Sequence, residues 1–148
     1  MTNQIKVSEI MTKSVIVAHS ENTFEQVMTF FKEVGVHHLP VTEGGKLVGL
    51  ISVKDLANFL FELAKEGKTD QASVNAAFKV TSVMTPNLIT VSPDDLVTKA
   101  VDILSNADFQ SLPVVSDGSL VGILTNKDIV KMLHWDYTHQ HGSNFTSL

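Results

Sequence analysis

The first half of the chain alternates short apolar runs with one stretch of helical apolar spacing. Val15-Ile16-Val17 is β-branched and predicts a strand. Ser20 is suited to begin the helix that follows, and Gly35 is suited to end it. Residues 43–46 predict a hairpin turn between two further strands. The predicted order is strand, helix, strand, strand, helix, over residues 14–17, 20–35, 38–41, 47–51 and 53–64.

The second half repeats this order. Ser92-Pro93-Asp94-Asp95 predicts a helix start, because it combines a capping residue, proline at the first position and acids in the first turn. Asp117-Gly118 predicts the second hairpin turn. The predicted elements cover residues 88–91, 92–107, 112–114, 120–124 and 129–133.

Four motifs recur at one constant offset along the chain. Met11-Thr12 returns as Met84-Thr85, and Leu39-Pro40-Val41 returns as Leu112-Pro113-Val114. The other two pairs are Leu47-Val48-Gly49 with Leu120-Val121-Gly122 and Lys54-Asp55 with Lys127-Asp128. The register holds without a gap between residues 7–60 and residues 80–133, so the chain is a tandem repeat.

The repeat sets the expected domain organisation. We expect an α/β protein of two β-α-β-β-α repeats, at residues 7–64 and 80–134. Residues 65–79 are polar and predict a linker with a short helix near 72–78. Residues 135–148 show no clear periodicity and predict a polar tail.

Composition narrows the function classes. The formal net charge of −5 argues against nucleic-acid binding, which needs a basic face. The chain has no cysteine, which excludes disulfides and thiolate chemistry. The first residues lack the basic and apolar regions of a signal peptide. No apolar run approaches the length that a membrane-spanning helix needs. We therefore expect a cytoplasmic protein without membrane insertion.

The ordered set of motifs resembles the CBS domain family, and two such units in tandem resemble a Bateman module. The resemblance covers residues 7–133 and rests on Met-Thr, Leu-Pro-Val and Gly-x-x-Ser/Thr-x-x-Asp, each present twice. It implies two repeats packed about a pseudo-two-fold axis, with two clefts between them. It also implies binding of AMP, ADP, ATP, S-adenosylmethionine or a dinucleotide, as in energy sensing, and a homodimer. The module is then expected to act in trans on a separate regulated protein. No cofactor is expected to be required.

Ser52-x-x-Asp55 and Thr125-x-x-Asp128 each allow two interpretations. The first is a helix capping box, in which the hydroxyl and the acid satisfy backbone N–H groups. The second, implied by the resemblance, is a nucleotide site in which the carboxylate accepts hydrogen bonds from the ribose diol. The hydroxyl would then help to hold phosphate, which a helix N-terminus favours. The two interpretations are partly compatible.

The resemblance also assigns the remaining site residues. His37 and His38 are expected on the phosphate side of the site that contains Asp128. Their counterparts Gln110 and Ser111 are neutral and would serve the site that contains Asp55. The Asp128 site is therefore predicted to be the better phosphate site. In the Asp128 site, adenine would contact Leu88 and Ile89, with Thr85 nearby. In the Asp55 site, it would contact Val15 and Ile16.

Other functions have weaker support. His134, His139 and His141 do not have the spacing of a metal site, so no metal is expected. The sequence lacks nucleophile, P-loop and dinucleotide motifs, so an enzyme is not expected. The alternative to a ligand sensor is a structural dimerisation or docking module whose clefts stay empty. The apolar helices over 53–64 and 129–133 motivate it.

Overall fold

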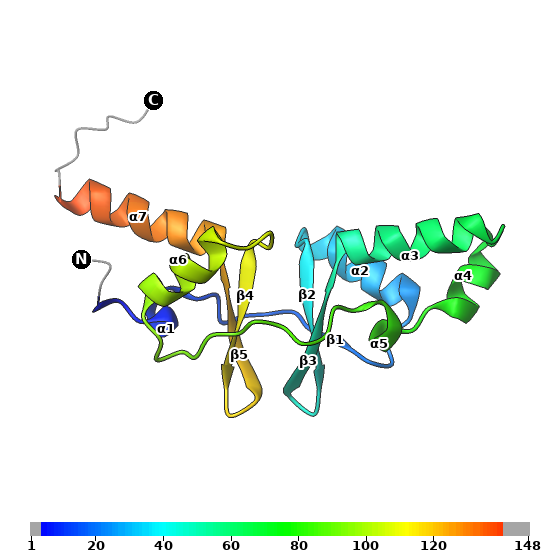
Figure 1. Ribbon diagram of the computed structural model, residues 1–148, viewed down its shortest axis with the longest axis horizontal. Coiled ribbons are helices and arrows are strands. Elements are labelled where there is room, and N and C mark those ends of the chain that lie inside the picture. Colours follow the sequence, from blue (N-terminus) through cyan, green and yellow to red (C-terminus); the bar gives the residue numbers. More distant parts are fainter. Residues whose placement is uncertain (1–3, 141–148) are drawn as a thin grey trace. The chain divides into compact units, whose positions relative to one another are not determined.

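The computed structural model describes residues 4–140, in seven helices and five strands (Figure 1). These residues form two compact units that do not coincide with the two sequence repeats. The first-repeat unit combines residues 16–89 with 117–120. The second-repeat unit combines 90–116 and 121 onward with the residues before 16. Each repeat thus contributes its opening segment to the unit built around the other repeat.

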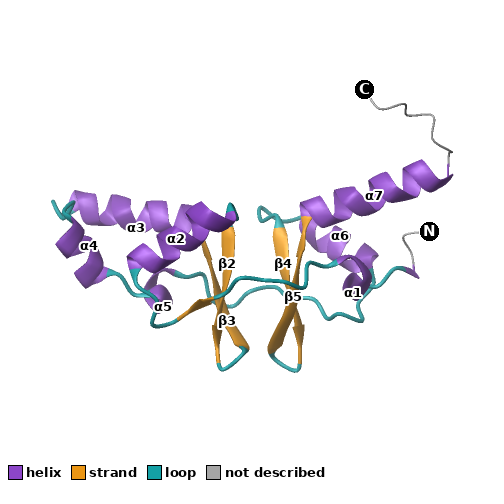
Figure 2. Cartoon of the chain, turned by 180° about the vertical axis from the view of Figure 1, so that it is seen from behind, coloured by secondary structure: helices purple, strands orange, loops and turns teal. Residues whose placement is uncertain are grey.

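The first-repeat unit has three strands and four helices (Figure 2). Strand β1 pairs in parallel with β2, and β2 pairs antiparallel with β3. Helix α2 ends at Gly35, whose φ of 69° is in the left-handed region. Glycine tolerates this conformation because it has no Cβ. The elements are β1 (Ala18–His19), α2 (Phe24–Val34), β2 (His38–Glu43), β3 (Lys46–Ser52), α3 (Val53–Lys65), α4 (Gln71–Ala77) and α5 (Val80–Val83).

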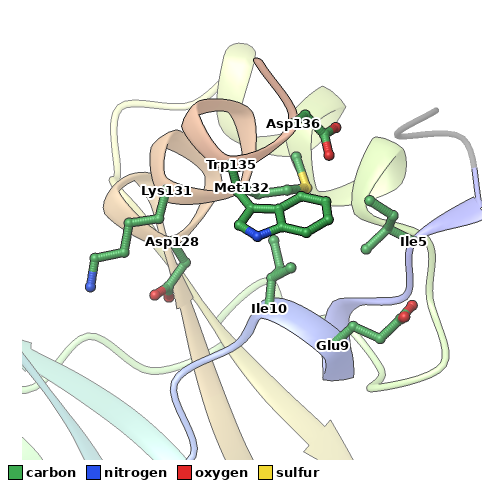
Figure 3. A pocket seen from close by; sticks show the side chains of 8 residues that line it. All are labelled: Ile5, Glu9, Ile10, Asp128, Lys131, Met132, Trp135 and Asp136. Atoms are coloured by element: carbon green, nitrogen blue, oxygen red, sulfur yellow. The ribbon is translucent and has the colours of Figure 1, made fainter. Parts of the chain in front are cut away.

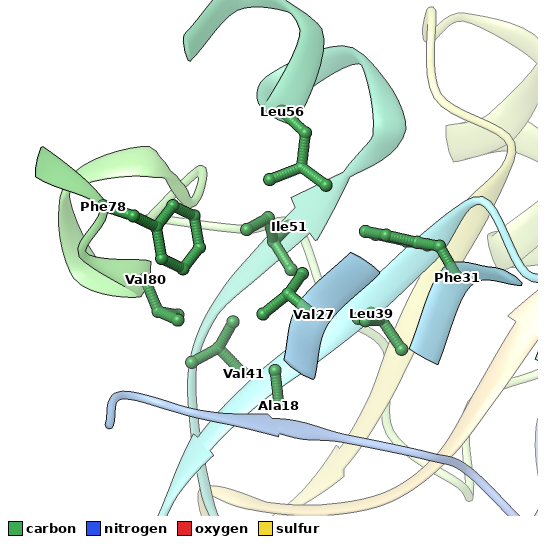
Figure 4. Packing of buried hydrophobic residues seen from close by; sticks show 9 residues of the cluster. All are labelled: Ala18, Val27, Phe31, Leu39, Val41, Ile51, Leu56, Phe78 and Val80. Carbon is green, nitrogen blue, oxygen red and sulfur yellow. The ribbon is translucent and has the colours of Figure 1, made fainter. Parts of the chain in front are cut away.

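The core of this unit is made by residues on both the sheet and the helices that cover it. Figure 4 shows the side chains of α2 and α3 meeting those of β2 and β3, with Phe78 and Val80 closing one end. The nine buried members are Ala18, Val27, Phe31, Leu39, Val41, Ile51, Leu56, Phe78 and Val80. Because Phe78 and Val80 lie beyond the first repeat, the following segment completes the core of this unit.

The second-repeat unit is built in the same way from three helices and a strand pair. Its elements are α1 (Val7–Ile10), α6 (Val97–Ser105), β4 (Ser111–Ser116), β5 (Ser119–Thr125) and α7 (Asn126–Gln140). Strands β4 and β5 are hydrogen-bonded neighbours. Val7 is fully buried in this core and is the counterpart of Val80. The buried cluster contains Val7, Val91, Ala100, Leu112, Val114 and Leu124.

The hairpin strands and the helices after them confirm the sequence prediction, whereas the first strand of each repeat does not. Residues 14–17 form no strand, and β1 covers only Ala18–His19. Residues 88–91 contribute a single parallel bridge between Val91 and Val114. Helix α2 is capped by Thr23 and not by Ser20. Thr23 Oγ1 accepts from the Gln26 N–H, and the Gln26 side chain accepts from Thr23 N–H.

The predicted helix start at Ser92 is wrong. Residues 92–95 close on themselves as a turn. Ser92 N–H donates to Asp95 Oδ2 at 2.8 Å, and Asp95 N–H donates to Ser92 O at 3.1 Å. Helix α6 begins two residues later, at Val97. The expected polar tail is also corrected: α7 continues through Gln140, and His141 with the residues after it lies outside the described chain.

Candidate functional site

Each Met-Thr pair forms a backbone bridge to the later half of a strand in its own unit. Thr85 exchanges two backbone hydrogen bonds with Leu50 of β3, at 2.7 and 3.0 Å. Thr12 exchanges two with Ile123 of β5, both at 2.9 Å. These bridges fix both threonines beside the end of the strand, where the next helix begins.

A glycine in each strand allows this bridge. A Cβ on Gly49 would lie 2.5 Å from Met84 Sδ and 3.1 Å from Thr85 O. A Cβ on Gly122 would lie 2.7 Å from Met11 Sδ and 2.9 Å from Thr12 O. Both glycines of the repeated Gly-x-x-Ser/Thr-x-x-Asp motif are therefore favoured by the close approach of the Met-Thr segment.

The hydroxyl and acid of each motif form a capping box at the helix N-terminus. Ser52 N–H donates to Asp55 Oδ2 at 2.9 Å, and Asp55 N–H donates to Ser52 Oγ at 3.1 Å. Thr125 and Asp128 exchange the same bonds at 3.0 and 3.2 Å. The capping interpretation is confirmed for both motifs, which places both carboxylates at the first turn of a helix.

A threonine from the bridging segment contacts each carboxylate. Thr85 Oγ1 donates to Asp55 at 3.3 Å, and Thr12 Oγ1 donates to Asp128 at 3.1 Å. Thr85 was expected near Asp128, and this assignment stays a prediction, since the hydroxyl contact recorded is with Asp55. Thr12 was missed as a site residue, although its signal was present in the recurrence of Met-Thr at the constant offset.

Both carboxylates keep acceptor capacity after these bonds. A carboxylate has about four lone-pair sites. Asp55 accepts from Ser52 N–H and the Thr85 hydroxyl, and Asp128 accepts from Thr12 and Thr125. Both acids are half-buried, while Thr12 and Thr85 are exposed. Each site can therefore accept hydrogen bonds from a diol at a fixed, solvent-accessible position.

The two histidines lie beside Ser52 and Asp55. His38 pairs with Ser52 across β2 and β3, and Val53 N–H donates to His37 O at 3.1 Å. Strand pairing therefore places both histidines next to the motif of their own repeat, while their expected assignment to the Asp128 site stays a prediction. Burial and the nearby charge of His37 lower the pKa of His38, and Asp55 opposes this shift.

Gln110 and Ser111 occupy the corresponding place beside Thr125 and Asp128. Asn126 N–H, at the start of α7, donates to Gln110 O at 3.0 Å. Ser111 is buried, and its Oγ has no hydrogen-bond partner among the described residues. The expected assignment of these two residues to the Asp55 site stays a prediction. A buried hydroxyl without a hydrogen-bond partner costs about 1–3 kcal/mol of stability. A hydrogen-bonding partner for Ser111 Oγ would therefore be favoured.

The family profile named "CBS domain" matches residues 7–62 and 80–134 of this chain. The chain belongs to the CBS domain family. The uncharacterized protein MJ0188 of Methanocaldococcus jannaschii is 35% identical over 130 residues, which cover 86% of this chain and 43% of that protein. This CBS chain spans less than half the length of the first curated relatives that it matches.

Two solved CBS structures resemble the chain over most of both lengths. CBSX2 in complex with AMP is 28% identical with a TM-score of 0.75, covering 89% of this chain and 98% of that one. The CBS domain pair of MJ0100, in complex with 5′-methylthioadenosine and S-adenosyl-L-methionine, is 28% identical with a TM-score of 0.71 and the same coverage. The predicted fold class and family are confirmed.

The four residues expected around adenine are divided between the CBS units. Val15 belongs to the second-repeat unit, which contains Asp128, whereas Leu88 and Ile89 belong to the first-repeat unit, which contains Asp55. Each opening segment joins the other unit, and the expected contacts of these residues with adenine stay a prediction. Ile16 is the exception and lies in the first-repeat unit. Ile16 and Ile89 are 42% and 53% exposed.

The described residues offer no cluster of three or more metal-ligating side chains, and no described helix is long and apolar enough to cross a membrane. His134 and His139 both lie on α7. The His139 ring stacks on Trp135, with centroids 4.1 Å apart. His141, the third histidine of that group, lies outside the described residues.

The threonines give a first testable prediction. Thr85→Val and Thr12→Val keep the shape of the side chain but remove the hydroxyl that holds the carboxylate. We expect adenosyl ligand to bind about 3- to 10-fold more weakly to the altered unit, with unfolding free energy changed by less than about 1 kcal/mol. Isothermal titration calorimetry measures this. Thr85→Ser and Thr12→Ser are matched controls that should retain wild-type affinity, and equal loss in the serine variants would contradict a role for the hydroxyl.

His38 gives a prediction for pH dependence. Its folded-state pKa lies below the ordinary 6.5, so the unfolded chain binds the proton more readily. The resulting stability is present above that ordinary value and is lost as the pH falls through 6.5 and then through the lower folded pKa. Urea unfolding of the wild type and of His38→Gln should therefore diverge from one another on acidification. Parallel pH profiles for the two proteins would refute the assignment.

Proposed function

We propose that this CBS chain is a regulatory module that binds adenosyl ligands and acts on a partner protein in trans. The ligand class is AMP, ADP, ATP or S-adenosylmethionine, with the ribose diol on Asp55 in one unit and Asp128 in the other. The observation that carries the proposal is a carboxylate that has the same surroundings in both units. Each one lies at a helix N-terminus, is held by a threonine hydroxyl, and keeps free acceptor sites.

The two solved relatives support the ligand class. AMP, 5′-methylthioadenosine and S-adenosylmethionine, the ligands of CBSX2 and the MJ0100 pair, share adenine and a ribose diol and differ in the 5′ substituent. A site that anchors the ribose therefore fits all three. The 5′ substituent is then selected by the residues around each anchor.

Those surrounding residues differ between the units. In the first-repeat unit, His37 and His38 adjoin the N-terminus of α3, which offers free N–H groups and a favourable dipole. We infer that a phosphate-bearing ligand prefers this unit, in contrast to the preference for Asp128 expected from sequence. In the second-repeat unit the neutral Gln110 and Ser111 take the place of the histidines.

A thermal-shift titration tests the proposal. A ligand that binds only the folded state stabilises it by RT ln(1 + [L]/Kd), about 2.7 kcal/mol at 100 times Kd. AMP, ADP, ATP, S-adenosylmethionine and NAD are compared at concentrations up to the millimolar range. We expect at least one adenosyl ligand to raise the unfolding temperature, and inosine 5′-monophosphate to serve as a base-specificity control. Absence of any shift with all of them would overturn the proposal.

An exposed apolar stripe along α3 supports self-association of the chain. Leu60 and Phe61 are 38% and 62% exposed, and Val53, at the start of the helix, is 45% exposed. Helical spacing places Ala57 and Ala64 on the same face. A contiguous stripe of this kind is typical of an interface, and the family resemblance implies a homodimer. We propose that α3 packs against a second copy of the chain.

The charge-introducing variant Phe61→Glu tests this interface. Sedimentation equilibrium should show a dimer for the wild type and a shift towards monomer for Phe61→Glu, by at least about 10-fold in dissociation constant, because an apolar contact is lost and a charge must be desolvated in the interface. Glu62→Gln, on another face of α3, is the control and should leave the assembly unchanged. The alternative function, a docking module with empty sites, predicts the same dimer but no thermal shift with any nucleotide.

A further inference from the structure

The second-repeat unit contains a cavity beside two of the three positions that hold packed aromatic rings in the first-repeat unit. In the first-repeat unit, Phe24, Phe59 and Phe78 pack with ring centroids 5.5–6.2 Å apart and fill the space between α2, α3 and the segment before α5. The residues at the matching positions of the repeat are smaller in each case: Val97 replaces Phe24, Met132 replaces Phe59, and Ile5 replaces Phe78. A cavity of about 350 Å³ lies beside Ile5 and Met132. This volume is typical of small-ligand sites.

The walls of this cavity come from α1, from Ile5 two residues before it, and from one face of α7. Figure 3 shows the indole of Trp135 close to Met132 and Ile10, with Ile5 on the far side. Trp135 is 60% exposed. Indole is nevertheless among the most favourable side chains to bury. The His139 ring stacks on the indole, with centroids 4.1 Å apart, and the part of the indole that stays exposed at the edge of an apolar cavity is a ready contact for a ligand.

The rim of the cavity is acidic. Glu9, Asp128 and Asp136 line it, against a single basic residue, Lys131. Figure 3 shows the Lys131 amine extending away from the indole. None of the four belongs to an ion pair recorded among the described residues. The rim therefore disfavours anions and favours a positive charge close to the indole.

We propose that this cavity binds a small organic cation with an apolar body, such as a quaternary or protonated amine. The apolar part would contact Ile5, Ile10 and Met132, and the charged group would lie against the Trp135 ring and the carboxylates of Glu9 and Asp136. Cation–π attraction and carboxylates act together in this arrangement. The cavity shares Asp128 with the proposed ribose anchor of this unit, whereas its other lining residues belong to neither anchor, so choline binding is measured in the absence of nucleotide.

Choline and 3,3-dimethyl-1-butanol provide the matched probes, because they share a shape and differ in charge. Trp135 is the only tryptophan in the chain, so its fluorescence reports on this cavity. We expect choline to change the emission saturably, with an affinity about 5- to 30-fold higher than that of the neutral alcohol. An equal response to both probes, or no saturable response to choline, would overturn the proposal.

Two kinds of variant locate the binding. Ile5→Phe copies the residue at position 78 and fills the cavity, so choline binding should be lost while AMP still raises the unfolding temperature. Asp136→Asn and Glu9→Gln should each weaken choline binding about 3- to 10-fold. Gln at position 9 can still accept the Lys6 N–H that Glu9 accepts. Unchanged choline affinity in all three folded variants would overturn the site. So would saturable quenching by a lysine-rich peptide but not by choline, which would indicate a protein-docking surface.

Discussion

Replacing Gly122 with alanine is expected to destabilise the protein by about 2–3 kcal/mol, which corresponds to a fall of about 5–10 °C in Tm. The new Cβ would lie 2.9 Å from the Thr12 carbonyl oxygen and 2.7 Å from Met11 Sδ. The carbonyl is fixed by its hydrogen bond to Ile123 N–H, so relief requires the Met-Thr segment to move away from β5. That movement also separates Thr12 from Asp128, and adenosyl binding to this unit should weaken with it.

Gly49 supplies the matched comparison. Its new Cβ would meet mainly the Met84 side chain, at 2.5 Å, while the Thr85 carbonyl is farther away at 3.1 Å. A methionine side chain can turn aside, so Gly49→Ala should cost about 1 kcal/mol and be largely rescued by Met84→Ala. Met11→Ala should not rescue Gly122→Ala to the same degree. Urea unfolding measures all four effects, and wild-type stability of Gly122→Ala would contradict the packing of the Met-Thr segment.

The largest expected effect on ligand binding comes from the two aspartates. Asp55→Asn and Asp128→Asn keep an oxygen that can cap the helix but lose the charge and one diol acceptor. Hydrogen bonds to charged groups contribute about 1.5–3 kcal/mol, so affinity at the altered unit should fall about 10- to 100-fold. Stability should change by less than about 1 kcal/mol, because the capping bond is retained.

Asp70→Asn is the control for this experiment. Asp70 also caps a helix, accepting from Ser73 N–H at 3.0 Å at the start of α4, and no Met-Thr segment reaches it. Its replacement should leave adenosyl affinity unchanged. Titration calorimetry with AMP and with S-adenosylmethionine measures each variant. Wild-type affinity in the Asp55→Asn/Asp128→Asn double variant would show that the carboxylates do not anchor the ligand.

Local signals in the sequence predicted much of this fold. The hairpin turns, the strands they join and the helices after them are encoded by turn residues and by apolar spacing, and each is found where expected. The capping boxes at Ser52 and Thr125 were equally local. The predictions failed at residues 14–17 and at Ser92. The β-branched run predicted a strand and the capping residue predicted a helix start, but both lie in irregular segments.

The exchange of opening segments between units had no local signal. Thr12 pairs with Ile123, and Thr85 pairs with Leu50, through backbone bonds that any residue types can make. Only the glycines indicate the close approach, and glycine in a strand has several other uses. The sequence therefore identified Asp55 and Asp128 as candidate anchors but gave no signal for the threonine contact that each of them makes. The structure places Thr85 and His38 with Asp55, and Thr12 and Ser111 in the unit of Asp128.

The central claim, that each repeated motif anchors a ribose, is tested most directly by a crystal structure of the protein grown with AMP. We expect electron density for the ribose diol within about 3.2 Å of the Asp55 carboxylate, a normal hydrogen-bond distance, with the phosphate near His37, His38 and the N-terminus of α3. At higher AMP concentration a second molecule should contact Asp128 in the same way. AMP bound with its ribose away from both aspartates would contradict the claim.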